Sequence, residues 1–256
     1  MFTSRIIMSK YQPPRSDAER LSMLKRSLET GQADRTASLN YLEQDILSQM
    51  NLFIPRFSAA LEAVGAALGH RSKEVREKDE AVGFVQVYLR DFWEVLKRRV
   101  NRENQPAEVL TYYKLPLDGT IPTLSSADLW LTQAASVAQG DGLAVAAGYE
   151  TMANPSAAKL QEVLAVAIAE VGDVAGADRV LDQAQERLAL LRGEADTLLQ
   201  EVMAQLRFQL RKKDESSQRR IMRSYGALFT TSAGEPTEEV VTPDNPVTAP
   251  EEVPEA

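Results

Sequence analysis

The sequence contains no cysteine and only one histidine, and both shortages remove whole classes of chemistry. Without cysteine there is no disulfide framework, no thiolate metal site and no cysteine nucleophile. With His70 alone, one chain cannot build a two-histidine zinc site or the paired Glu-x-x-His motifs of di-iron bundles. We therefore expect no catalytic residue, no metal site and no cofactor.

Long apolar runs and phosphate-binding loops are also missing. No stretch reaches the roughly 18 uninterrupted apolar residues that span a bilayer, and the nearest candidates, 52–69 and 157–177, contain charged side chains. The first ten residues lack the apolar core of a signal peptide, and Met8 offers an alternative start. The glycines of segment 140–142 are not followed by the lysine of a P-loop. We expect a cytoplasmic protein that is not an NTPase.

Bases are absent from the C-terminal end of the chain. Residues 234–256 contain seven acids and no Lys or Arg, within a net charge of −8 for the whole chain. Several prolines and few large apolar side chains accompany them, so this segment cannot bury enough surface to fold. We predict a disordered, acidic, proline-rich tail at 233–256. The 44% hydrophobic content of the chain is enough for a sizeable core elsewhere.

Apolar side chains recur every three or four residues through most of the chain, which predicts an all-α fold. An extended segment at 1–15 precedes the first helical unit, 16–104. Ser16 is a suitable N-cap for its first helix. The elements expected in this unit are helices at 16–30, 37–69 and 73–103, with a stop at Gly31, a kink at Pro55 and a turn at 70–72.

Prolines and glycine mark residues 105–124 as an ordered linker with a short helix. The second helical unit spans 125–232, and Ser125 or Ser126 caps its first helix. Its strongest signal is a four-heptad apolar stripe from Val174 to Val202, which predicts one long helix. The breaks or bends expected in this unit lie at 140–142, at 154–155, and at Gly172 and Gly176.

Residues 75–113 align weakly with residues 192–225. Leu89-Arg90 falls on Leu206-Arg207, and Tyr113 falls on Tyr225. Each half then consists of an Ala-rich helix, a long heptad helix, a basic stretch and a short helix that ends in tyrosine. The predicted fold is a bundle of two long-helix hairpins with an internal repeat. Chance similarity between two amphipathic helices is the alternative.

The two basic stretches are candidate contacts for an anion or a partner. Cations near helix C-termini are also favoured by the helix dipole, so a purely structural role stays open. The candidate residues are Lys97, Arg98, Arg99 and Arg102 in the first stretch and Arg211, Lys212, Lys213, Arg219, Arg220 and Arg223 in the second.

Sustained heptads without catalytic groups favour a non-enzymatic scaffold or protein-interaction protein that self-associates through its heptad faces. The expected partner is another protein or a second copy of the chain. A nucleic-acid-associated protein that uses the basic helix ends is the alternative. A membrane-remodelling or pore-forming helical bundle is the third hypothesis.

Overall fold

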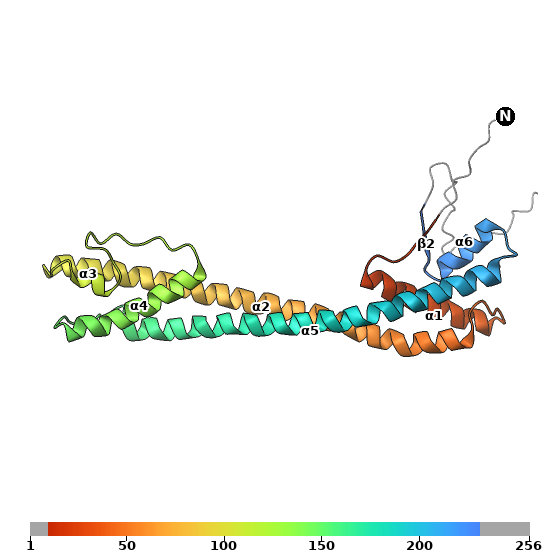
Figure 1. Cartoon of the computed structure of the whole chain (residues 1–256), viewed down its shortest axis with the longest axis horizontal. Coiled ribbons are helices and arrows are strands. Elements are labelled where there is room, and N and C mark those ends of the chain that lie inside the picture. Colours follow the sequence, from red (N-terminus) through yellow and green to blue (C-terminus); the bar gives the residue numbers. More distant parts are fainter. Residues whose placement is uncertain (1–9, 231–256) are drawn as a thin grey trace, which may run out of the picture. The chain divides into compact units, whose positions relative to one another are not determined.

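The computed structural model describes residues 10–230, which form helices and one short pair of strands (Figure 1). The elements are β1 (Tyr11–Gln12), α1 (Asp17–Thr36), α2 (Gln44–Arg102), α3 (Val109–Tyr112), α4 (Ala127–Ala146), α5 (Ala157–Leu210), α6 (Glu215–Ser224) and β2 (Leu228–Phe229). The all-α prediction is confirmed. The tail expected at 233–256 lies outside the described residues.

The chain forms two compact units. The described residues of unit 1 are 10–43 and 202–230, and unit 2 consists of residues 44–201. The division expected from the sequence, 16–104 and 125–232, kept each half of the chain together. Unit 1 instead joins segments from both ends.

Helix α2 is continuous over 59 residues, so the predicted turn at 70–72 is wrong. That prediction relied on three consecutive polar residues. In the structure the Ser72 hydroxyl donates to the carbonyl oxygen of Leu68 at 2.9 Å, and Arg71 pairs with Asp178 of α5. Polar side chains can bond along or beside a helix without interrupting its backbone hydrogen bonds, and here they do.

Glycines that were predicted to stop or bend helices lie inside continuous helices. Helix α1 passes through Gly31, α4 through 140–142, and α5 through Gly172 and Gly176. Glycine costs a helix roughly 1 kcal/mol relative to alanine, and the packing of neighbouring apolar residues exceeds that cost. The predicted break at 154–155 is confirmed, because it lies between α4 and α5.

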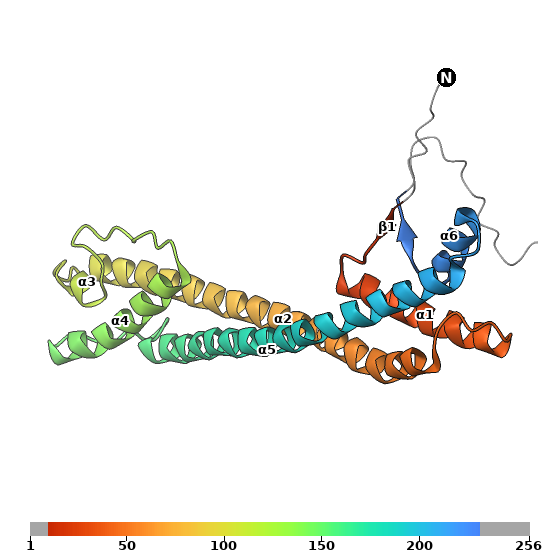
Figure 2. The same cartoon turned by 45° about the vertical axis from the view of Figure 1, so that its right-hand side comes forward.

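The core of unit 2 lies where α2, α3, α4 and the first part of α5 meet. One apolar face of α2 is buried here, and Val85, Leu89 and Leu96 on it are each 0% exposed. The Trp93 indole N–H donates to the Tyr113 carbonyl oxygen at 2.9 Å and so ties the end of α3 to α2. Within this unit, α2 and α5 run side by side in opposite directions (Figures 1 and 2).

The apolar stripe predicted for α5 is also buried. Its residues in unit 2 include Ala177, Leu181, Ala184, Leu188 and Leu198, which are at most 9% exposed. Spacing by three and four therefore identified the packed face correctly.

Unit 1 is closed by hydrogen bonds between segments that are distant in sequence. β1 pairs antiparallel with β2, with Tyr11 opposite Phe229 (Figure 2). The Ser27 hydroxyl of α1 donates to the Tyr225 carbonyl oxygen at 2.8 Å, and the Tyr225 hydroxyl donates to the Asp34 carboxylate at 2.6 Å. These bonds attach the residue that follows α6 to α1.

The observed elements also repeat in order, although the helices predicted at 37–69 and 73–103 are joined in one of them, α2. Helices α1 and α4 each have 20 residues and a serine N-cap, and α2 and α5 have 59 and 54 residues. The short helices α3 and α6 are followed by Tyr113 and Tyr225. Each tyrosine donates to an aspartate of a 20-residue helix, Tyr113 to Asp141 of α4 at 2.8 Å and Tyr225 to Asp34 of α1.

Candidate functional site

The first predicted basic cluster does not form one surface. Arg99 is 8% exposed, and its guanidinium donates to the carbonyl oxygens of residues 150–151 at 2.6 and 2.9 Å. It therefore holds the connection between α4 and α5. At the same end of α2, Lys97 is partly buried, while Arg98 and Arg102 are exposed.

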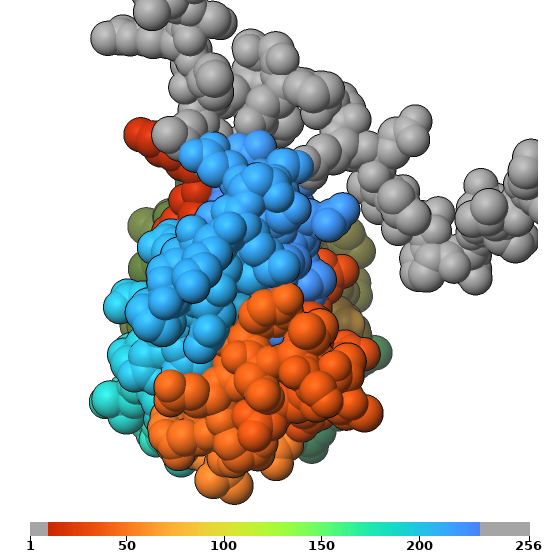
Figure 3. All heavy atoms as spheres, turned by 90° about the vertical axis from the view of Figure 1, so that its right-hand side faces the viewer, coloured from red at the N-terminus to blue at the C-terminus, as the bar shows by residue number. Residues whose placement is uncertain are grey.

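The second predicted basic cluster stays together in unit 1, on the C-terminal end of α5, the turn after it, and α6 (Figure 3, blue). Arg211, Lys212 and Lys213 are exposed at the end of α5. In α6, Arg220 and Arg223 are exposed, and the remaining member, Arg219, is partly buried. The structure thus brings together the second cluster and disperses the first.

A groove of about 390 Å³ lies between α2 and α5 in unit 2. Its apolar lining includes Ala81, Phe84 and Val87 of α2 and Val163 and Val166 of α5. Phe84 is 68% exposed, Val87 59% and Val166 56%. Large apolar side chains gathered in a concave site are typical of a binding surface.

The charged side chains that line this groove are all acidic. They are Glu77, Glu80 and Asp91 of α2 and Glu170 of α5. Glu77 pairs with Lys73 at 2.8 Å, whereas no ion pair joins Glu80, Asp91 or Glu170 to any residue in 10–230. The groove therefore offers apolar contact together with negative charge that its own surroundings do not neutralise.

Charge is divided unequally between the two units. Unit 2 contains 23 Asp and Glu against 15 Lys and Arg, a net charge of −8. The described part of unit 1, residues 10–43 and 202–230, contains 7 acids against 13 bases, a net charge of +6, whereas residues 1–9 and 231–256, which lie outside the described range, contain seven acids and one base. Clustered charge of one sign attracts partners of the opposite sign, and the two units therefore favour different partners.

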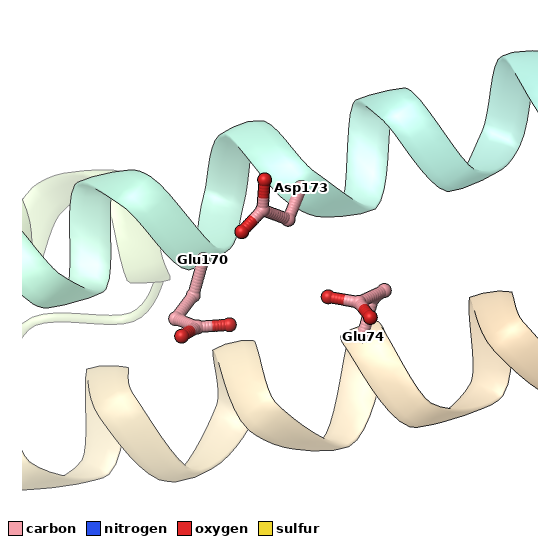
Figure 4. Close-up of side chains that lie close together, drawn as sticks. All are labelled: Glu74, Glu170 and Asp173. Atoms are coloured by element: carbon pink, nitrogen blue, oxygen red, sulfur yellow. The ribbon is translucent and has the colours of Figure 1, made fainter.

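Three carboxylates converge beside the groove, Glu74 from α2 and Glu170 and Asp173 from α5 (Figure 4). One oxygen of each lies within 4.8 Å of the others, an arrangement that can hold a hard divalent cation such as Mg²⁺ or Ca²⁺. Glu74 also lies 3.2 Å from the Lys73 ammonium and 3.3 Å from Nε2 of His70. A metal ion would compete with these neighbours for Glu74.

The buried tyrosines are locked in the protonated form. Burial raises the pKa of Tyr113 and of Tyr225 well above the usual range, and the hydrogen bond to Asp141 or Asp34 raises it further. Asp141 also accepts a bond from the Thr151 hydroxyl at 2.5 Å. These groups fasten α3 and α6 to their neighbours and are poorly suited to proton transfer at neutral pH.

Helix α2 contains a stretch of 18 residues that is long and apolar enough to cross a membrane, and 22% of that stretch is buried. No other helix within 10–230 contains such a stretch. One helix of this kind is a weak indication, because core helices of soluble proteins have the same composition.

Sequence reasoning did not identify Phe84, Val87 and Val166 as site residues. Phe84 and Val87 fall between the buried positions Val82, Val85 and Leu89 of α2, and apolar residues off the buried face of a helix can mark a second contact face. That signal was present in the sequence. The wall of the groove that α5 forms could not be predicted, because it depends on how α2 and α5 are aligned.

Comparisons with known protein families, with curated proteins and with solved structures found no match for this chain. Its function has to be inferred from the surfaces described above.

Proposed function

We propose that this protein is a non-enzymatic scaffold or interaction protein, and that the groove of unit 2 docks a helix of a partner protein. The observation that carries the proposal is the exposure of Phe84, Val87 and Val166 in one groove. Burying such side chains contributes about 25 cal/mol per Å² of apolar surface. An amphipathic helix laid in a groove is a common way to bury them.

The acids of the groove specify the charge of that partner. Glu80, Asp91 and Glu170 would face Lys or Arg on the edges of the docked helix, while its apolar side chains would cover Phe84. Complementary charge of this kind speeds association and selects against wrong partners. We therefore propose a basic amphipathic helix as the ligand.

The same acids disfavour pairing of two copies groove to groove. A twofold dimer presents one patch to the identical patch, so these carboxylates would meet their own kind. Like charges brought together at an interface cost several kcal/mol. Self-association through heptad faces stays a prediction, and it would have to use another surface.

The environment of the buried ionisable side chains supports a non-enzymatic role. Glu74 contacts Lys73, Arg99 binds backbone carbonyl oxygens, and Asp141 accepts hydrogen bonds. Arg99 and Asp141 do not line the groove, and Glu74 lies beside it. Their charge is directed at neighbours that hold the fold together.

Peptide binding tests the proposal. The probe is a labelled amphipathic peptide of roughly 18 residues built from Leu and Lys, and fluorescence anisotropy measures its affinity for the full chain. Phe84→Ser should weaken binding about tenfold or more, because removing a buried aromatic contact costs about 1.5–3 kcal/mol. The double variant Glu80→Gln, Glu170→Gln should also weaken peptide binding. This loss of affinity should be larger at low salt than at high salt.

Leu190→Ser is the matched control, since Leu190 is 77% exposed on α5 and does not line the groove. Equal affinities for wild type, Phe84→Ser and Leu190→Ser would reject the groove as the docking site. Equal binding of a Leu/Glu peptide would reject the role of its acids. If the peptide instead dissociates an oligomer, the occupant is a second copy and not a separate protein.

A further inference from the structure

Unit 1 carries two adjacent aromatic rings flanked by two arginines. The Arg207 guanidinium lies 5.7 Å from the centre of the Tyr11 ring, and the Arg223 guanidinium lies 5.8 Å from the centre of the Phe229 ring. The two rings contact edge to face, with centres 6.2 Å apart. The pairing of β1 with β2 places the rings side by side, because Tyr11 lies opposite Phe229.

A second arginine and aromatic pair lies on the same helix as Arg207. The Arg211 guanidinium stacks 4.0 Å from the centre of the Phe208 ring, and its Nη1 donates to the Phe208 carbonyl oxygen at 2.6 Å. Phe208 is 60% exposed. Arg207 and Arg211 are four residues apart, so they are neighbours on one face of α5.

This surface belongs to the described part of unit 1, which carries a net charge of +6. Three further basic side chains, Lys212, Lys213 and Arg220, are exposed close in sequence to the stacked pairs. Guanidiniums stack on aromatic faces and also bind phosphate oxygens in pairs. Exposed rings stack bases of any sequence.

We propose that unit 1 binds single-stranded nucleic acid, with Arg207, Arg211 and Arg223 on its phosphates and Phe208 as a stacking platform. Single strands present phosphates and unstacked bases together, which matches guanidiniums held next to aromatic rings. The inference concerns a different unit from the proposed docking groove and does not rest on it.

An anionic lipid surface is the competing ligand for a basic patch. Membrane association of a basic surface grows with the apolar area that enters the lipid. Here two of the three rings, Tyr11 and Phe229, are only partly exposed and contact arginines. Lipid would gain little from them, whereas a flexible strand can reach both kinds of side chain.

The test uses the full chain and fluorescein-labelled poly(dT) and poly(U) of about 20 nucleotides, titrated in a salt series from about 50 to 200 mM. Arg207→Ala, Arg211→Ala and Arg223→Ala combined should reduce the slope of log affinity against log salt by about 2, because each lost phosphate contact removes about 0.7. Phe208→Ala should lower affinity about tenfold and leave that slope unchanged.

Two variants make the result specific. Arg98→Ala with Arg102→Ala removes two exposed arginines from unit 2 and should leave affinity and slope unchanged. Arg211→Lys keeps the charge but loses the flat guanidinium, so affinity should fall severalfold at constant slope. Circular dichroism checks that every variant is folded.

Three outcomes would overturn the proposal. One is an affinity for double-stranded DNA that equals the affinity for poly(dT). Another is an unchanged affinity in Phe208→Ala. The third is tighter binding to phosphatidylserine vesicles than to either polymer, which would assign the surface to lipid. Phe84→Ser, the groove variant, should not alter nucleic-acid binding, so the two proposals can fail separately.

Discussion

At the scale of single residues, Tyr113 in unit 2 and Tyr225 in unit 1 make corresponding hydrogen bonds. Each side chain is 0% exposed, and its hydroxyl donates a hydrogen bond to an aspartate of another helix. Deprotonation would place two negative charges side by side in a buried site. The protonated hydroxyls are therefore part of what keeps α3 and α6 in place.

Stability should consequently fall at alkaline pH. Above a pH of about 10, tyrosines of the unfolded chain ionise, while Tyr113 and Tyr225 of the folded chain keep their protons because their pKa is raised. The contribution present below that pH is lost above it, with a slope approaching 1.4 kcal/mol per pH unit for each tyrosine. Urea unfolding measured across this range gives the slope.

Tyr113→Phe should reduce that slope and also cost roughly 1 kcal/mol at neutral pH, because Asp141 loses a donor. Tyr149→Phe is the control, since Tyr149 is only partly buried in the same unit. If Tyr113→Phe and Tyr149→Phe gave the same slope, the assignment to Tyr113 would be wrong.

At the scale of elements, α3 and α4 approach so closely that only glycine fits between them. A Cβ atom added to Gly140 would lie 1.9 Å from the Tyr112 carbonyl oxygen, which is far below contact distance. A Cβ atom added to Gly142, two residues further along α4, would meet nothing within 4 Å. The same helix therefore contains one obligatory glycine and one that is not required.

We predict opposite effects of alanine at these positions. Gly140→Ala should destabilise the protein by about 1–3 kcal/mol, because the backbone of α3 would have to move. Gly142→Ala should stabilise it by up to about 1 kcal/mol, because alanine is the better helix former. Thermal unfolding of both variants tests this prediction. Equal melting temperatures would show that α3 does not pack on Gly140.

The packed face of α5 could be read from the sequence, whereas the continuity of the long helices could not. Periodicity reports which side is buried, so the stripe from Val174 to Val202, which includes Leu188, was assigned to the packed face correctly. A polar run such as 70–72 permits a turn without requiring one, and the helix continues because α5 lies alongside. The groove at Phe84 needs the alignment of two helices that are distant in sequence, which a single sequence does not specify.

At the scale of the whole molecule, charge is the property that separates the two units. The net charge is −8 in unit 2 and +6 in the described part of unit 1. Opposite charges allow residues 10–43 and 202–230 of one copy to attract unit 2 of another, and the seven acids of 234–256 oppose that attraction. Such attraction is screened within about 10 Å at 0.1 M salt.

Self-association should therefore depend on salt. Light scattering at low salt is expected to give an average mass above the 28.3 kDa of one chain, and the mass should fall toward that value as salt is added. An oligomer that persists unchanged in high salt would instead indicate an apolar contact between heptad faces. A strict monomer at every salt concentration would refute self-association altogether.

The construction of unit 1 from both ends of the chain also affects when it can fold. Its closing bonds join residues 191 and 198 positions apart, Asp34 to Tyr225 and Ser27 to Tyr225. On the ribosome, α1 emerges before unit 2 yet waits for its partner until synthesis has passed Tyr225. Residues 44–201 are complete earlier, so unit 2 can fold while synthesis continues. Among the described helices, the one translated first is thus among the last to be fixed in place.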